Sequence, residues 1–154
     1  VVTTFLHTII SLLPKLVFGF LLLVQLGKLW NMHLSPDARY PIYRAAGEWL
    51  RENTPADDSV GAVEVGIIGY YSQRRMVDFA GLIQPDIAQQ LGISRSYDGA
   101  ALWAFEHYPV GTLVAHLDTG SVLASEGASR CQLQITLTGA EYGYAHDLGI
   151  FTCP

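Results

Sequence analysis

The first thirty residues are almost continuously apolar, whereas the rest of the chain alternates short apolar runs with polar turns. Between Phe5 and Trp30, 17 of 26 residues are hydrophobic, and Leu16–Leu26 contains no charged side chain. A helix needs about 20 apolar residues to cross the hydrocarbon core of a bilayer. The pattern therefore predicts a transmembrane segment over residues 1–32 and a second domain over residues 33–154.

Two arrangements of the apolar segment fit this pattern. A single helix from about Thr4 to Trp30 places Lys15 near the bilayer centre, which costs roughly 2.5–3.5 kcal/mol. The arrangement that we favour has a tight turn at Pro14-Lys15, between the end of one spanning helix and a second helix over Leu16–Met32. Lys15 then lies in a short cytoplasmic loop, as expected for a positive charge. The second domain is consequently expected on the periplasmic or extracellular side of the cell membrane.

Two other interpretations of the apolar segment are a signal peptide and a buried hairpin of a soluble protein. The chain starts with Val1 rather than Met and has no Ala-x-Ala cleavage site after the apolar run, which disfavours a signal peptide. We therefore expect the chain to be the C-terminal piece of a longer membrane protein.

The second domain shows a strand–helix alternation. Ser35-Pro36-Asp37 is expected to end the apolar helix. Buried strands are predicted over residues 60–63, 76–79 and 112–115, and helices begin near Ile42, Gln84 and Gly99, the last capped by Asp98. Residues 64–71 are interpreted as a strand, a turn and a short helix. This order predicts a mainly parallel α/β sheet.

The C-terminal part has a different pattern. Residues 131–138 alternate between apolar and polar side chains, which predicts a half-buried antiparallel strand that pairs with a final strand ending at residues 150–153. In a hairpin centred on Tyr142, Cys131 faces Cys153, and the two are either disulfide-bonded or two buried thiols. The predicted fold is thus α/β: an N-terminal transmembrane helix or helix pair, then a small mixed sheet with a C-terminal antiparallel hairpin.

Composition and charge limit the possible partners. Half of the 154 residues are hydrophobic and 15% are charged, which excludes a disordered chain. The net charge is −5, and from Asn31 onward seven basic residues face fourteen acidic ones. This sign disfavours binding to nucleic acid.

Short motifs provide little chemistry. Asp118-Thr119-Gly120-Ser121 is similar to the active-site signature of aspartic proteases, but a protease needs a second copy or a dimer, and the surrounding helices do not fit an all-β lobe. The glycines at residues 61, 66 and 69 do not have the spacing of a nucleotide-binding loop. The five histidines are scattered, and we predict no metal site in this chain.

A longer ordered set of residues spans positions 43–91. It comprises Tyr43-x-x-Ala46-Gly47-Glu48-Trp49-Leu50, Asn53-Thr54-Pro55, residues 60–63, Glu64-Val65-Gly66-Ile67-Ile68-Gly69-Tyr70-Tyr71-Ser72, Arg75-x-Val77-Asp78, Gly81-Leu82 and Pro85. The set resembles the extracytoplasmic C-terminal domain of bacterial C-superfamily membrane glycosyltransferases, which are similar to dolichyl-phosphate-mannose protein mannosyltransferases.

The resemblance implies an integral-membrane glycosyltransferase that uses a polyprenyl-phosphate-linked sugar donor. Its partners would be the lipid bilayer, an upstream transmembrane bundle and the lipid-linked sugar. The catalytic acidic residues of that family lie in an upstream loop that this sequence does not contain, so no catalytic residue is assigned and this piece alone is expected to be inactive. No cofactor is expected in this chain, although the full-length family is compatible with a divalent metal.

Five residues match the recurring C-terminal motif of that family: Glu64, Tyr70, Tyr71, Arg75 and Asp78. The resemblance implies that they contact the sugar or the acceptor, or that they pack the domain, and packing is the interpretation that we favour. A membrane-anchored extracytoplasmic binding or sensory domain without enzymatic activity is the alternative function, and a dimeric aspartic protease is a third.

Overall fold

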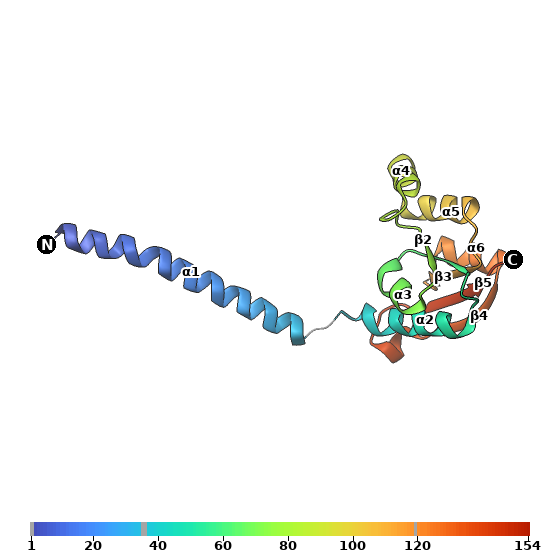
Figure 1. Ribbon diagram of the computed structural model, residues 1–154, viewed down its shortest axis with the longest axis horizontal. Helices are drawn as coiled ribbons and strands as arrows, with labels where there is room; N and C mark the ends of the chain where they lie inside the picture. Colours follow the sequence, from blue (N-terminus) through green and yellow to red (C-terminus); the bar gives the residue numbers. More distant parts are fainter. Residues whose placement is uncertain (1, 35–36, 119) are drawn as a thin grey trace. The chain divides into compact units, whose positions relative to one another are not determined.

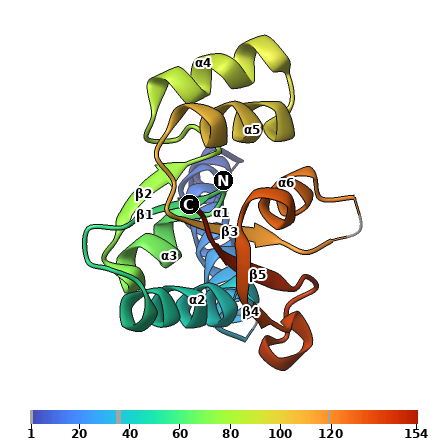
Figure 2. The ribbon, with the colours of Figure 1, turned by 90° about the vertical axis from the view of Figure 1, so that its right-hand side faces the viewer.

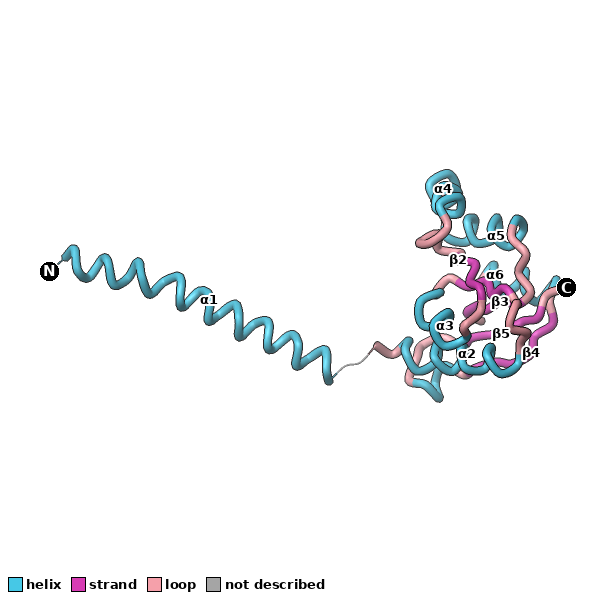
Figure 3. The backbone as a smooth tube through the Cα atoms, in the orientation of Figure 1, coloured by secondary structure: helices cyan, strands magenta, loops and turns pink. Residues whose placement is uncertain are grey.

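The computed structural model describes residues 2–34, 37–118 and 120–154, with side chains described from Leu12 onward. It divides the chain into two compact units, residues 1–37 and 38–154. The boundary lies five residues beyond the position that the apolar pattern predicts. Figures 1 and 3 show a helical first unit and a second unit that mixes helices and strands.

The first unit is a single helix, α1 (Val2–Leu34), drawn in blue in Figure 1. The turn expected at Pro14-Lys15 is therefore wrong, because the helix continues through Pro14. A proline removes one backbone hydrogen bond from a helix, but the leucines on either side are strong helix formers. By length and composition alone, the segment Leu12–Leu34 could cross a bilayer. The break expected at Ser35-Pro36 lies outside the described residues.

The second unit alternates helices with strands before it ends in a hairpin. Its elements are α2 (Arg39–Asn53), β1 (Ser59–Ala62), α3 (Val65–Ser72), β2 (Arg75–Asp78), α4 (Pro85–Ser94), α5 (Tyr97–His107), β3 (Thr112–His116), α6 (Val122–Arg130), β4 (Gln132–Leu137), the short 3-10 helix η1 (Gly139–Tyr142) and β5 (Leu148–Thr152). The strands predicted over residues 60–63, 76–79, 112–115 and 131–138 and the final strand are all present, each within two residues of its expected position.

The five strands form one mixed sheet in the order β2-β1-β3-β5-β4. Strands β2, β1 and β3 are parallel, and β5 runs antiparallel to both β3 and β4. From β1 the chain passes through α3 to β2, and it then returns past β1 to form β3 on the other side. The strand order thus reverses between β1 and β3, and ligands of open α/β sheets bind beside the carboxyl ends of the strands at such a point.

Helices cover both faces of the sheet, and each face has its own apolar core. Ile42 and Leu50 of α2 and Ile68 of α3 pack on one face with Val60 and Val114. The opposite core joins α4, α5 and α6 to the sheet through a second buried set: Val77, Phe79, Ile87, Ala100, Ala101, Ala104, Leu113, Leu123 and Phe151. Figure 2 shows α4 beside α5 and α2 near α3, and α6 contacts α5 and the sheet. The fold is therefore a three-layer α/β/α arrangement.

Two helices differ from the sequence-based expectation. Residues 65–72 are entirely helical, whereas a strand, a turn and a short helix were expected over residues 64–71. A side chain at Gly47 would meet Cβ of Tyr71 at 2.7 Å, so this glycine allows α2 and α3 to pack closely. Helix α6 is not predicted by the apolar pattern; it starts where the Ser121 side chain accepts a hydrogen bond from the backbone N–H of Ala124.

The N-terminus of α5 also differs from the expectation. Ser96 rather than Asp98 caps this helix, and its side chain accepts a hydrogen bond from the backbone N–H of Gly99. Asp98 lies within the first turn, where a carboxylate interacts favourably with the helix dipole.

The predicted pairing of the C-terminal hairpin is confirmed where its two strands are farthest from the connecting turn. Gln132 pairs with Thr152, and Cys131 and Cys153 are joined by a disulfide bond. A register shift between Leu133 and Ile135 moves the remaining pairs by one residue. The alternation places Leu133 on the apolar face of this strand, which is expected to be buried, but the Leu133 side chain is 48% exposed because β4 lies at an edge of the sheet.

Candidate functional site

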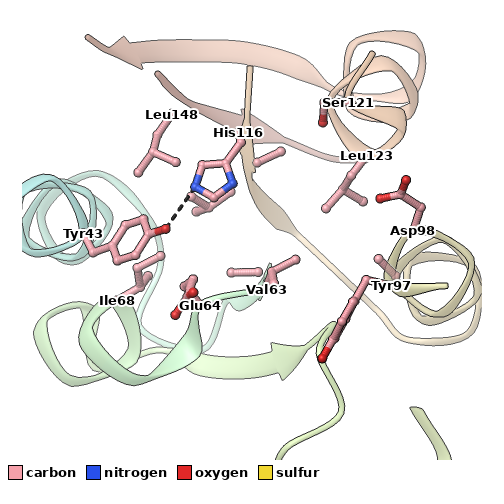
Figure 4. A pocket seen from close by; sticks show the side chains of 14 residues that line it. Tyr43, Val63, Glu64, Ile68, Tyr97, Asp98, His116, Ser121, Leu123 and Leu148 are labelled. Atoms are coloured by element: carbon pink, nitrogen blue, oxygen red, sulfur yellow. Dashed lines mark hydrogen bonds between the residues drawn. The ribbon is translucent and has the colours of Figure 1, made fainter. Parts of the chain in front are cut away.

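A cavity of about 110 Å³ lies beside the carboxyl ends of β1 and β3 (Figure 4). It is smaller than the about 300–1,000 Å³ that is typical for drug-sized ligands. Its polar lining consists of Tyr43, Glu64, Tyr97, Asp98, His116 and Ser121. Its apolar lining consists of Ala62, Val63, Ile68, Ala101, Val114, Ala115, Leu123 and Leu148. The cavity thus occupies the point where the strand order reverses, and every lining residue belongs to the second unit.

Tyr43 and His116 are two polar residues of the cavity lining that contact each other. The Tyr43 hydroxyl is 2.9 Å from Nε2 of His116, and these two side chains point toward each other in Figure 4. The Tyr144 hydroxyl lies 3.2 Å from the Tyr43 hydroxyl and 3.4 Å from the same imidazole nitrogen. Three side chains from α2, β3 and the β4–β5 connection therefore share one hydrogen-bonded cluster, although they are far apart in the sequence.

Burial changes the protonation equilibria of this cluster. Desolvation raises the pKa of Tyr43 well above its ordinary value, and the hydrogen bond with Tyr144 acts in the same direction. Desolvation lowers the pKa of His116, while the charge of Asp118 partly opposes that shift. Tyr43 and His116 are thus both neutral near neutral pH, and each can donate or accept a hydrogen bond.

A histidine–carboxylate pair extends this cluster toward the surface. Nδ1 of His146 is 2.7 Å from Oδ1 of Asp118, and the His116 and His146 rings have their centroids 5.5 Å apart. Asp118 belongs to the segment that is similar to the protease signature; Thr119 of that segment lies outside the described residues. The carboxylate pairs with a histidine, and Ser121 caps α6 within an α/β fold. These contacts give both residues a role that does not involve a protease.

Carboxylates border the cavity, but no lysine or arginine lines it among the residues that the structure describes. Glu64 forms an ion pair with Arg39 at 3.2 Å, in which both side chains are nearly half exposed. Asp98 lies in the first turn of α5, and the Ser96 and Ser121 caps already use backbone donors at the starts of α5 and α6. The cavity is therefore rich in hydrogen-bond acceptors and favours ligands that carry neutral donors such as hydroxyl groups.

Of the five motif residues that the resemblance marks, only Glu64 lines the cavity. Tyr71 packs edge-on against Tyr40 and Tyr70, and the Arg44 guanidinium lies 5.2 Å from its ring centroid. Tyr70 itself is 76% exposed. Tyr70 and Tyr71 of α3, together with Tyr40 of α2, thus form an aromatic surface that is separate from the cavity.

Arg75 and Asp78 lie at the two ends of β2 and also outside the cavity. Arg75 is exposed at the first position of the strand. Asp78 is fully buried, and its carboxylate accepts hydrogen bonds from the backbone N–H groups of Ala80 and Ile83, both at 2.9 Å. Asp78 therefore organises the loop after β2, which is a packing role.

Sequence reasoning missed Tyr43, His116 and Tyr144 as site residues. His116 ends a strand of the parallel part of the sheet, and polar residues at this position are a known signal for ligand sites. No local signal marks Tyr144, because its contact with Tyr43 joins positions 101 residues apart. Within the described residues, no group of three or more His, Cys, Asp or Glu side chains could hold a metal ion.

Lowering the pH is expected to destabilise the domain through His116. Because burial lowers the pKa of His116, the unfolded chain binds a proton at this imidazole at pH values where the folded protein does not. The free energy of unfolding therefore falls as the pH drops below about 6.5, by up to about 1.4 kcal/mol per pH unit for this group. We expect His116→Gln to flatten that slope in urea unfolding between about pH 5.5 and about pH 7.5. Equal slopes in the two proteins would contradict the assignment.

Comparison with known families gives one match. The model of a domain family of unknown function, DUF8728, matches residues 30–97, which is less than half of the chain. The match covers the end of α1 and all elements from α2 to α4, but not His116 or Tyr144. No curated protein and no solved structure matches the chain.

Proposed function

We propose that this chain is the C-terminal part of an integral-membrane glycosyltransferase that uses a polyprenyl-phosphate-linked sugar donor. In this proposal the second unit is an extracytoplasmic domain whose cavity binds one sugar residue, and catalysis belongs to another part of the enzyme. The observation that supports it most is the cavity at the carboxyl ends of β1 and β3. Its lining includes the hydrogen-bonded neutral pair Tyr43–His116 and the carboxylates of Glu64 and Asp98.

The chemistry of the cavity suits a sugar better than a phosphate. Sugar hydroxyls donate hydrogen bonds to carboxylates such as Glu64 and Asp98, and they exchange hydrogen bonds with tyrosine and imidazole groups. Phosphate sites instead gather arginine, lysine or free helix N-termini. Tyr97 adds an aromatic ring, 62% exposed, against which the apolar face of a sugar ring can pack. These features support a single neutral sugar unit as the proposed ligand.

A membrane-anchored binding domain without an enzymatic parent is the second candidate. It is favoured by the fact that all the described residues that line the cavity lie within residues 38–154. The sequence encoded upstream of Val1 discriminates the two functions. Several further spanning helices and an acidic pair in an extracytoplasmic loop would support the transferase, and their absence would support the binding domain.

Sugar binding can be tested with the 154-residue chain in lipid nanodiscs. Calorimetric titration with neutral hexoses is expected to show saturable binding. The expected Kd is millimolar, which corresponds to a binding free energy of about −4 kcal/mol. Asp98→Asn should weaken binding by about tenfold, because it removes a charged acceptor from the cavity border. Asp86→Asn is the matched control, since Asp86 also lies in the first turn of a helix but outside the cavity.

Two outcomes would contradict the proposal. Inorganic phosphate that binds more tightly than any neutral hexose would exclude sugar recognition by this cavity. Sugar transfer catalysed by the 154-residue chain alone would contradict the assignment of catalysis to another part of the enzyme.

A further inference from the structure

The loop between β2 and α4 exposes two adjacent large apolar side chains. Leu82 is 80% exposed and Ile83 is 62% exposed. We call these two residues the 82–83 tip; the loop that carries them connects β2 with α4 (Figure 1). Isolated exposed apolar residues are common, but adjacent ones at a loop tip suggest a contact surface.

The loop is held in this conformation by an extensive hydrogen-bond network. The buried Asp78 carboxylate accepts from the N–H groups of Ala80 and Ile83, and its backbone carbonyl accepts from Gly81 at 3.0 Å. Gln84 accepts a hydrogen bond from the Asp78 N–H at 2.8 Å and donates one to the Met76 carbonyl. Gly81 adopts a positive φ of 75°, which favours glycine. The fold therefore presents the apolar tip in a defined conformation.

The helices that follow the tip also expose apolar side chains, and residues 79–94 carry little charge. Ile93 at the end of α4 and Tyr97 at the start of α5 are more than 60% exposed. Residues 79–94 carry one charged side chain, Asp86, whose carboxylate is hydrogen-bonded to the Tyr108 hydroxyl. A segment with one charged side chain in an otherwise acidic domain meets little electrostatic repulsion at a membrane surface.

We propose that the 82–83 tip inserts into the interfacial region of the lipid bilayer. A lipid surface is the partner that fits, because residues 35–38 alone separate this domain from a helix of membrane-spanning length and composition. Amphipathic segments with exposed Leu and aromatic side chains bind at the boundary between headgroups and acyl chains. The inference rests on the proposed membrane function.

The position of the tip gives this contact a functional meaning. Strands β1, β2 and β3 are parallel, so the loop after β2 and the cavity beside β1 and β3 lie at the same edge of the sheet. Tyr97 lines the cavity, and its side chain is 62% exposed. Insertion of the tip therefore holds the cavity at the membrane surface, where a sugar attached to a lipid is presented.

Fluorescence quenching in nanodiscs tests the contact. A single cysteine introduced as Leu82→Cys is labelled with a small fluorophore in the 154-residue chain, with the native disulfide intact. Phosphatidylcholine carrying a nitroxide quencher near the headgroup is expected to remove most of this fluorescence. Leu133→Cys is the matched control, because Leu133 is also an exposed leucine but lies on the edge strand β4. Its label should keep its intensity.

A third label separates this inference from the proposed function. Leu22→Cys places the fluorophore in α1, where a quencher located deep in the acyl chains should act if the helix spans the bilayer. Quenching at position 22 without quenching at position 82 would overturn the tip contact alone. No quenching at position 22 would overturn the membrane function itself. A label at position 82 that is shielded from water but not quenched by lipid would indicate a protein partner and would also overturn the inference.

Discussion

Replacement of both Cys131 and Cys153 by serine is expected to lower the free energy of unfolding by about 3 kcal/mol. The disulfide joins residues 22 positions apart, so it removes conformational entropy from the unfolded chain when it closes this loop. For a domain of this size, the loss corresponds to a decrease in Tm of about 10–20 °C. Urea unfolding of the full chain in detergent, followed by tryptophan fluorescence, measures the change.

The wild-type chain treated with dithiothreitol serves as the control for the cysteine variants. Reduction breaks the same bond without changing the side-chain volume, so its midpoint should match that of the double serine variant. A loss of less than about 1 kcal/mol would show that the bond does not stabilise the hairpin against the unfolded state.

Asp78→Ala is expected to destabilise the domain by about 3 kcal/mol. The substitution removes the acceptor of two backbone N–H groups at a fully buried position, and buried donors without partners are costly. The loop that carries Leu82 and Ile83 should lose its defined conformation as well. Urea unfolding gives the first effect, and hydrogen exchange of the Ala80 and Ile83 amides gives the second.

Asp86→Ala is the comparison for this experiment. Asp86 lies in the first turn of α4 and is exposed, and its side chain bonds to Tyr108. Removal of the Asp86 carboxylate should lower the free energy of unfolding by less than Asp78→Ala does, because water can replace the lost hydrogen bonds at the surface. Equal effects of the two substitutions would contradict the structural role of Asp78.

The strands were predictable because each is a short apolar run with turn residues at both ends. Residues 112–116, for example, follow Pro109 and Gly111 and are almost completely buried. The alternation of residues 131–138 similarly predicted an antiparallel hairpin. A hairpin centred on Tyr142 places Cys131 opposite Cys153, and these two residues form the disulfide bond. These features depend on local periodicity, which the sequence contains directly.

The errors arise where local signals are ambiguous. Pro14 next to Lys15 resembles a turn, yet the helix formers around it keep α1 continuous. Residues 65–72 are apolar with two glycines, a composition that fits either strand or helix, and packing on α2 at Gly47 accompanies the helical outcome. Helix α6 contains small and polar residues with little apolar periodicity, so no pattern indicated it.

The candidate site was predictable only in part. Of the residues that the family motif marks, Glu64 lies two residues after the end of β1 and lines the cavity. The other motif residues lie away from the cavity. Tyr70 belongs to the exposed aromatic surface, and the buried side chain of Asp78 binds the backbone of the loop after β2. The Tyr43–His116 contact joins positions 73 residues apart, and only the strand order brings them together.

The location of β5 has a consequence for biosynthesis. This strand is the last element of the sheet to be synthesised, yet it lies between β3 and β4 and pairs with both. Until the ribosome has released residues 148–152, one edge of β3 remains open and its apolar side chains lack their final neighbours. Exposed strand edges of this kind are prone to intermolecular pairing. A nascent chain stalled before Leu148 should therefore depend on chaperones that shield such edges.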